Sequence, residues 1–96
     1  MMVLICYDVQ TETKAGRRRL GRVARACKDF GYRVQKSVFE CLLADADWVR
    51  LKHRLLGEID ANADSLLFYF IDEEARKKKE HHGIGEPIDP EGPLVV

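Results

Sequence analysis

The chain lacks the features that mark membrane and secreted proteins. No apolar run approaches the ~18 residues of a membrane-spanning helix, and no charged segment followed by an apolar one opens the chain, so we expect a cytoplasmic protein with no membrane partner. The three cysteines, Cys6, Cys27 and Cys41, are odd in number and show no CxxC spacing. Because each lies among apolar residues, they are predicted to be buried free thiols in a reducing compartment.

The chain also lacks a net charge, since it has 16 basic and 16 acidic residues. A pI above ~9 is the usual sign of a nucleic-acid-binding protein, so the bulk value argues against that class. The charges are nevertheless segregated: residues 11–36 hold nine Lys and Arg against two acids, whereas residues 37–75 hold three against nine. This segregation allows a basic face on a neutral protein, and it equally suits a solvated helix balanced by intramolecular ion pairs.

The length of 96 residues, of which 46% are hydrophobic, suits one domain with a modest core. The apolar run over residues 2–7 predicts a buried strand with Asp8 at its carboxyl end. Residues 32–43 are rich in β-branched and aromatic side chains, which predicts one long bent strand or a hairpin, and no Asn-Gly or Asp-Gly decides between them. Residues 65–71 predict a further buried strand.

Two segments show the apolar spacing of amphipathic helices. The first runs from residue 14 to about residue 30, with Thr11 or Thr13 as a candidate N-cap and Gly31 as its end. The second follows Asp45, which we interpret as its N-cap, and ends before Asn62. The apolar stripes are Leu20, Val23, Ala24, Cys27 and Phe30 in the first helix, and Trp48, Leu51, Leu55 and Ile59 in the second.

The order of these elements predicts an α+β fold, a ferredoxin-like βαββαβ sandwich with both helices on one face of the sheet. We assign residues 1–83 to this domain and residues 84–96 to a C-terminal tail. The tail ends in Leu94, Val95 and Val96 after a stretch rich in Pro and Gly. An apolar end of this kind suits a strand added to an open sheet edge, either of the same chain or of a partner.

Five segments together are similar to one known family. They are YDV at residues 7–9, GRRRLGRVARACKDFG at 16–31, RVQKSVFECLL at 33–43, DSLLFYF at 64–70 and GIGEPIDPEGPLVV at 83–96. On these segments the chain resembles the CRISPR-associated Cas2 family over essentially its whole length. YDV after an apolar strand and RVQKSVFE about two dozen residues later are the most specific parts of the resemblance.

The resemblance implies a homodimer of small ferredoxin-like subunits in which each C-terminal segment pairs with the partner's sheet. It implies a role in CRISPR spacer acquisition, as the adaptor that binds double-stranded DNA for the Cas1 integrase. It also implies an endonuclease acting on RNA or double-stranded DNA with Mg²⁺ or Mn²⁺, and an edge strand within residues 72–80. A toxin-type ribonuclease and a non-catalytic ferredoxin-like regulatory subunit are the alternatives.

The family's catalytic aspartate falls on Asp8, so the resemblance makes Asp8 the catalytic residue and the metal ligand. Mg²⁺ needs only one or two carboxylates besides water and phosphate oxygens, and two Asp8 residues meeting across a dimer axis would supply them. One chain offers no obvious second ligand, so this site requires a dimer. The alternative is that Asp8 is a helix cap or an ordinary surface residue.

The arginines of the first helix are the candidate phosphate contacts, because guanidinium groups fit phosphate oxygens without reading the base sequence. The helical period places three of them away from the core, with the other two beside them; ordinary solvation of a charged helix face is the alternative. Arg33 and Lys36 are weaker candidates in the following strand region. The helix candidates are Arg17, Arg18, Arg19, Arg22 and Arg25.

Three further residues are supporting candidates. Tyr7 precedes Asp8 and its hydroxyl could orient a water or a phosphate, although a half-buried structural tyrosine is an equal alternative. The family resemblance assigns an influence on activity to Arg33 and Phe39. Ser37 and Phe39 suit packing or the dimer seam as well, and for Phe39 we favour packing.

Overall fold

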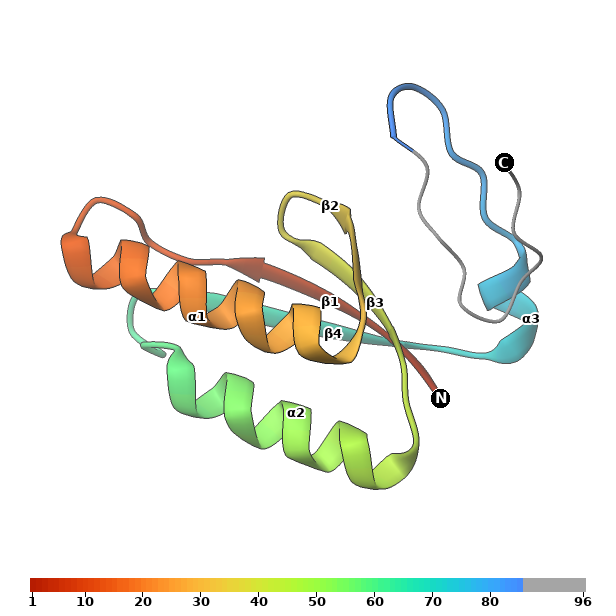
Figure 1. Ribbon diagram of the computed structural model, residues 1–96, viewed down its shortest axis with the longest axis horizontal. Coiled ribbons are helices and arrows are strands. Elements are labelled where there is room, and N and C mark those ends of the chain that lie inside the picture. The colour runs from red at the N-terminus through yellow and green to blue at the C-terminus, as the bar shows by residue number, and fades with distance from the viewer. Residues whose placement is uncertain (86–96) are drawn as a thin grey trace.

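The computed structural model describes residues 1–85 and forms a four-stranded antiparallel sheet with helices (Figure 1). Its neighbouring strands follow the order β2-β3-β1-β4, which confirms the ferredoxin-like arrangement. Residues 32–43 form a hairpin rather than one bent strand, turning at Lys36 and Ser37. The elements are β1 (Met2–Asp8), α1 (Lys14–Phe30), β2 (Tyr32–Gln35), β3 (Val38–Leu42), α2 (Asp45–Glu58), β4 (Ser65–Ile71) and α3 (Glu73–Lys77).

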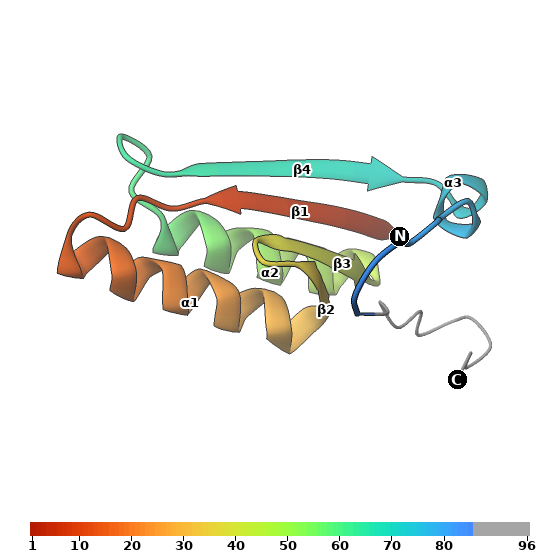
Figure 2. The same ribbon diagram turned by 90° about the horizontal axis from the view of Figure 1, so that it is seen from above.

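The sheet has one face covered by helices, because α1 and α2 both lie on the same side of it (Figure 2). Side chains alternate along β1, so Val3, Ile5 and Tyr7 are buried beneath the helices. The intervening side chains lie on the opposite side, together with their cross-strand neighbours in β4. We call this side the open face; its members near the middle and carboxyl end of β1 are Leu4, Cys6, Asp8, Ser65, Leu67 and Tyr69.

The core lies between the sheet and the two helices. Trp48 of α2 meets the rings of Phe68 and Phe70 edge to face, at centroid distances of 4.9 and 5.6 Å. Burial raises the pKa of both core thiols, Cys27 and Cys41, to about 12, so neither is a nucleophile near neutral pH. The largest fully buried side chains are Phe39, Ile5, Leu51, Leu55, Val3, Val23, Cys27 and Cys41.

Helix α1 is fixed at both ends by features of its sequence. The Thr13 hydroxyl accepts a hydrogen bond from the Gly16 amide at 3.0 Å, so Thr13 is the N-cap. At the other end Gly31 has an extended backbone that any residue adopts, with φ of −165°. A glycine is required there because a Cβ would lie 2.5 Å from Cys41 Sγ and 2.9 Å from Cys41 Cα.

Three expectations for local structure are wrong. Residues 65–71 form a strand, but β4 lies at the edge of the sheet and none of its residues is fully buried. Ala44, not Asp45, occupies the N-cap of α2. Asp45 is the first helical residue, where its negative charge is stabilised by the positive end of the helix dipole. The edge strand implied for residues 72–80 is absent from the described part of the chain. Instead, α3 forms because Asp72 Oδ1 accepts a hydrogen bond from the Ala75 amide at 2.7 Å and caps it.

The predicted C-terminal strand at Leu94, Val95 and Val96 lies outside the described residues. Among residues 1–85, no helix has the length and apolar character needed to cross a membrane.

Candidate metal and nucleic-acid site

Asp8 lies at the carboxyl end of β1, on the open face of the sheet. It pairs with Ser65 of β4, and its side chain is exposed. Within residues 1–85 the Asp8 carboxylate has no hydrogen bond or ion pair. A carboxylate in this position is accessible to a cation or a second protein molecule.

The open face is apolar beside Asp8. Leu67 and Tyr69 of β4 are 47% and 52% exposed, and they flank Cys6 and Leu4 of β1. An exposed apolar patch on the part of a sheet face that no helix covers is typical of a protein–protein interface. Asp8 therefore lies at the edge of a surface suited to association.

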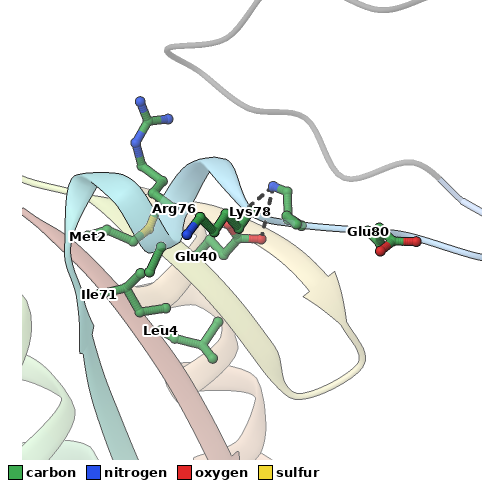
Figure 3. A pocket seen from close by; sticks show the side chains of 9 residues that line it. Met2, Leu4, Glu40, Ile71, Arg76, Lys78 and Glu80 are labelled. Atoms are coloured by element: carbon green, nitrogen blue, oxygen red, sulfur yellow. Dashed lines mark hydrogen bonds and ion pairs between the residues drawn. The ribbon is translucent and has the colours of Figure 1, made fainter.

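The other end of the open face is occupied by α3 and the residues after it. A hollow of about 340 Å³ separates them from the sheet, with Met2, Leu4 and Ile71 on its apolar side (Figure 3). Lys79 closes one rim by pairing with Glu40 of β3 at 3.3 Å. Met2 is only 4% exposed as a result, so α3 covers the amino-terminal end of β1.

Tyr7 and Asp8 are neighbours in sequence but point to opposite faces of the sheet. Tyr7 is 5% exposed and packs on Phe39, with ring centroids 6.1 Å apart. The Tyr7 hydroxyl donates a hydrogen bond to the Lys36 carbonyl at 3.4 Å, and burial raises its pKa while Arg33 partly opposes that rise. This geometry favours the structural alternative for Tyr7, since its hydroxyl lies on the helix side of the sheet.

The β2–β3 hairpin brings the other supporting candidates beside Tyr7. Arg33 lies over the ring of Phe39, 5.3 Å from its centroid, and Phe39 is fully buried in the core. The Ser37 carbonyl accepts a hydrogen bond from the Tyr7 amide at 3.0 Å, which holds the hairpin turn against β1. Arg33 and Lys36 are exposed at this edge of the sheet.

The arginines of α1 separate into exposed and engaged groups. Arg18 and Arg25 are exposed and have no ion pair within the described chain. Arg17 is exposed and donates to the Thr11 carbonyl at 3.1 Å, whereas Arg22 pairs with Glu58 of α2 at 2.6 Å. The helix therefore presents a basic outer face, part of which is shared with α2.

Arg19 differs from the other arginines because it faces inward to Asp64. Its Nε and Nη2 atoms donate to the two Asp64 carboxylate oxygens at 2.7 and 3.2 Å. The Arg19 side chain is 15% exposed and that of Asp64 is 0% exposed. The pKa of Asp64 is lowered to about 2, mainly by the hydrogen-bonded Arg19 and to a smaller extent by the hydrogen bonds from the Asp60 and Gln10 amides.

Asp64 is a residue that the sequence did not single out. Its side-chain partner Arg19 and the Gln10 amide lie 45 and 54 residues away, and only the Asp60 amide is local. In the sequence, Asp64 is simply an acid in a loop just before an apolar strand. Residues 1–85 contain no group of three or more His, Cys, Asp or Glu side chains that could hold a metal ion. The Asp8 carboxylate is a suitable oxygen ligand for Mg²⁺, but a complete site needs ligands from outside one chain.

Comparisons with known proteins agree on one family. The family model described as CRISPR associated protein Cas2 matches residues 1–79. The CRISPR-associated endoribonuclease Cas2 of Nitratidesulfovibrio vulgaris is 53% identical over 96 residues, covering 100% of this chain and 94% of that protein.

Two solved structures are similar in fold and sequence. The crystal structure of Streptococcus pyogenes Cas2 matches with a TM-score of 0.78 and 51% identity, covering 86% of this chain and 100% of that chain. A chain of a partial Cas6-RT-Cas1–Cas2 complex matches with a TM-score of 0.64 and 27% identity, covering 99% of this chain and 96% of that chain.

Proposed function

This chain belongs to the CRISPR-associated Cas2 family, and from that premise we propose that it is the homodimeric adaptor that binds double-stranded DNA for the Cas1 integrase in spacer acquisition. The observation that carries the DNA-binding role is the basic outer face of α1, where Arg18 and Arg25 are exposed and unpaired within the described chain. A relative in a complex named for Cas1 and Cas2 supports the Cas1 partner.

The neutral overall charge does not oppose this role. Of the basic side chains on α1, only Arg19 and Arg22 form ion pairs in the described chain, so the outer face keeps its positive field. Arginines on such a face contact phosphates and fix position without reading base sequence. Binding to a DNA duplex should then depend steeply on salt, because each phosphate contact releases a counterion.

Arg18→Glu tests the DNA-binding role. We expect lower affinity for every duplex sequence and a salt dependence whose log–log slope is shallower by about 0.9 for each lost contact, or about 1.8 for a dimer that loses two. Arg50→Glu is the matched charge-reversal control, because Arg50 is 71% exposed and belongs to α2, not to the proposed contact helix α1. Fluorescence anisotropy across a salt series measures both quantities, and an Arg18→Glu protein with the slope and affinity of Arg50→Glu would refute the role.

The open face is the proposed homodimer interface. Two copies related by a two-fold axis would cover Leu67 and Tyr69 of each chain and bring the two Asp8 side chains toward the axis. Leu67→Glu should therefore dissociate the dimer. Leu56→Glu is a close control, since Leu56 is 52% exposed on α2 and Leu67 is 47% exposed. Sedimentation that shows equal association of the two variants would exclude this interface.

A second function, cleavage of phosphodiester bonds in RNA or double-stranded DNA, is favoured by the exposed Asp8 carboxylate and by relatives named endoribonuclease and endonuclease. In the dimer, the two Asp8 carboxylates, one from each copy, would together hold a single Mg²⁺ or Mn²⁺. When bound, such an ion activates a water and stabilises negative charge on the phosphate. Asp8 contributes a hard oxygen ligand, while the exposed arginines of α1 bind and orient the phosphate backbone.

Asp8→Asn separates the two functions. It should abolish Mn²⁺-dependent cleavage while duplex binding persists, because the α1 face is unchanged. Asp45→Asn removes an exposed carboxylate from α2 and is the control expected to keep cleavage. Cleavage by highly purified Asp8→Asn protein at the wild-type rate would rule out the nuclease assignment and leave the adaptor role standing.

A further inference from the structure

Asp64 joins three separate segments of the chain through one buried carboxylate. Oδ1 accepts hydrogen bonds from the Gln10 amide at 3.0 Å and from Arg19 Nη2 at 3.2 Å. Oδ2 accepts hydrogen bonds from Arg19 Nε at 2.7 Å and from the Asp60 amide at 2.8 Å. The loop after β1, helix α1 and the loop before β4 therefore all converge on this side chain.

This junction lies next to Asp8 along β1 and next to its cross-strand partner along β4. Gln10 follows Asp8 by two residues, and Ser65, which directly follows Asp64, is the cross-strand partner of Asp8. The end of β1 is thus tied to the start of β4 on both sides of the Asp8 position. A shift of Asp64 would move the backbone that sets the direction of the Asp8 carboxylate.

Gln10 is also held from the side of α1. The Thr13 hydroxyl donates to Gln10 Oε1 at 3.3 Å. Gly16 lies so close that a Cβ on it would be 2.9 Å from the Gln10 carbonyl carbon, which is closer than real Cβ contacts come. Gln10, in the loop after Asp8, is therefore tightly packed against α1, and Asp64 supplies the buried acceptor for its backbone amide.

Arg19 is poorly placed for a nucleic acid. Its side chain is 15% exposed, and two of its nitrogen atoms donate to Asp64. Contact with a phosphate would break this bidentate pair and leave the Asp64 carboxylate buried without its counter-charge, which is strongly unfavourable. Arg18 is exposed and meets no such cost.

We infer that Arg19 is not a phosphate contact, and that Arg19 and Asp64 form a positioning pair that fixes the end of β1 and so orients Asp8. The metal-binding part of this inference rests on the proposed nuclease function. The pair is distinct from the exposed arginines of α1, although Arg19 directly follows Arg18 in sequence. Positioning partners of metal ligands typically change metal affinity or activity on the order of 10–100-fold when they are removed.

The first test compares the salt dependence of duplex binding. Arg18→Gln should make the log–log slope shallower by about 0.9 per lost contact, whereas Arg19→Gln should leave the slope at its wild-type value. If Arg19→Gln made the slope as shallow as Arg18→Gln does, the inference would be overturned. A wild-type protein that binds no duplex would instead refute the proposed DNA-binding role.

The second test requires neither DNA nor cleavage. Amide hydrogen exchange of folded protein should become faster at Asp8 and Gln10 in Arg19→Gln and in Asp64→Asn. Arg54→Gln is the matched control, because it removes the 2.7 Å Arg54–Asp29 pair, which joins α1 to α2 and does not involve the loop before β4. Exchange at Asp8 and Gln10 that is the same in Arg19→Gln and Arg54→Gln would overturn the positioning role.

A third measurement links position to metal binding. Mn²⁺ affinity from isothermal titration calorimetry should fall on the order of 10–100-fold in Arg19→Gln and Asp64→Asn, and remain unchanged in Arg54→Gln. The double variant should be no weaker than the more affected single variant, because the two residues act as one unit. Wild-type Mn²⁺ affinity in both single variants would refute control of the metal site by this pair.

Discussion

Gly31→Ala is expected to destabilise the fold because helix α1 ends in direct contact with β3. A Cβ at position 31 would lie 2.5 Å from Cys41 Sγ and 2.9 Å from Cys41 Cα, and it would also overlap the Glu40 carbonyl oxygen. Ordinary contacts between carbon atoms are ~3.5–4.0 Å, so the helix end and the strand must separate. Two of the atoms in the way belong to the backbone of the sheet, so a rotamer change alone does not relieve the overlap.

The magnitude follows from two opposing terms. Overpacking of this kind costs about 1–3 kcal/mol in free energy of unfolding. Replacing Gly by Ala recovers about 0.4–1 kcal/mol by restricting the unfolded chain. We therefore expect a net loss of about 1–2 kcal/mol. The extended φ of −165° adds no further cost, because alanine adopts it freely.

Two other glycines provide controls of opposite sign. Gly21 in α1 and Gly57 in α2 are exposed helical positions at which a Cβ would meet no atom within 4 Å. Alanine there should stabilise the protein by about 0.8–1.0 kcal/mol through helix propensity. Gly31→Ala and Gly57→Ala should consequently differ by about 2–3 kcal/mol, which corresponds to a Tm difference on the order of 10 °C for a domain of this size.

Urea denaturation followed by circular dichroism measures these differences. All variants must be compared at one protomer concentration, because the stability of a dimer depends on concentration. A Gly31→Ala protein as stable as Gly57→Ala would show that α1 does not press against β3 as described. A loss of stability in Gly57→Ala would contradict the helix-propensity argument.

Three further results are expected. First, the pKa of Asp64 is about 2 in the folded protein, so its contribution to stability is fully present above the pKa of ~3.9 in the unfolded chain and is lost as pH falls toward 2. The difference in free energy of unfolding between wild type and Asp64→Asn should narrow over that pH range. A constant difference in urea titrations would contradict the ion-pair argument. Second, Glu58→Gln frees Arg22 from its 2.6 Å pair and should strengthen duplex binding at low salt, whereas weaker binding in anisotropy assays would exclude Arg22 as a phosphate contact. Third, in the Leu67→Glu variant, whose open face is not covered by a second copy, a maleimide should label Cys6 before the buried Cys27 and Cys41. Mass spectrometry that finds all three labelled at one rate would contradict the burial of Cys27 and Cys41.

The main elements were predictable because their signals are local. The apolar run of β1 and the helical stripe of α1 depend on residues within a few turns of one another. Thr13 was one of two candidate N-caps, and its hydroxyl does accept a hydrogen bond from the Gly16 amide. The hairpin was not decided by sequence, because Lys36 and Ser37 carry no specific turn signal and the pairing shifts register between Arg33 and Gln35.

The site was predictable only in part. The resemblance pointed to Asp8, and strand alternation then fixes which face of the sheet carries it. The same alternation separates Tyr7 from Asp8, so adjacency in sequence gave no information about a shared site. For α3, Asp72 caps a short helix within a charged run whose composition suggested no helix.

The sequence by itself determined the order of strands and helices, the family resemblance and the basic character of α1, because each depends on residue type and short-range spacing. The tertiary structure decided which arginines remain available on that helix. Arg18 and Arg19 are adjacent and chemically identical, but Asp64, 45 residues away from Arg19, engages only the second. Ion pairs of this range depend on how the loops pack together, and no local pattern in the chain encodes that packing.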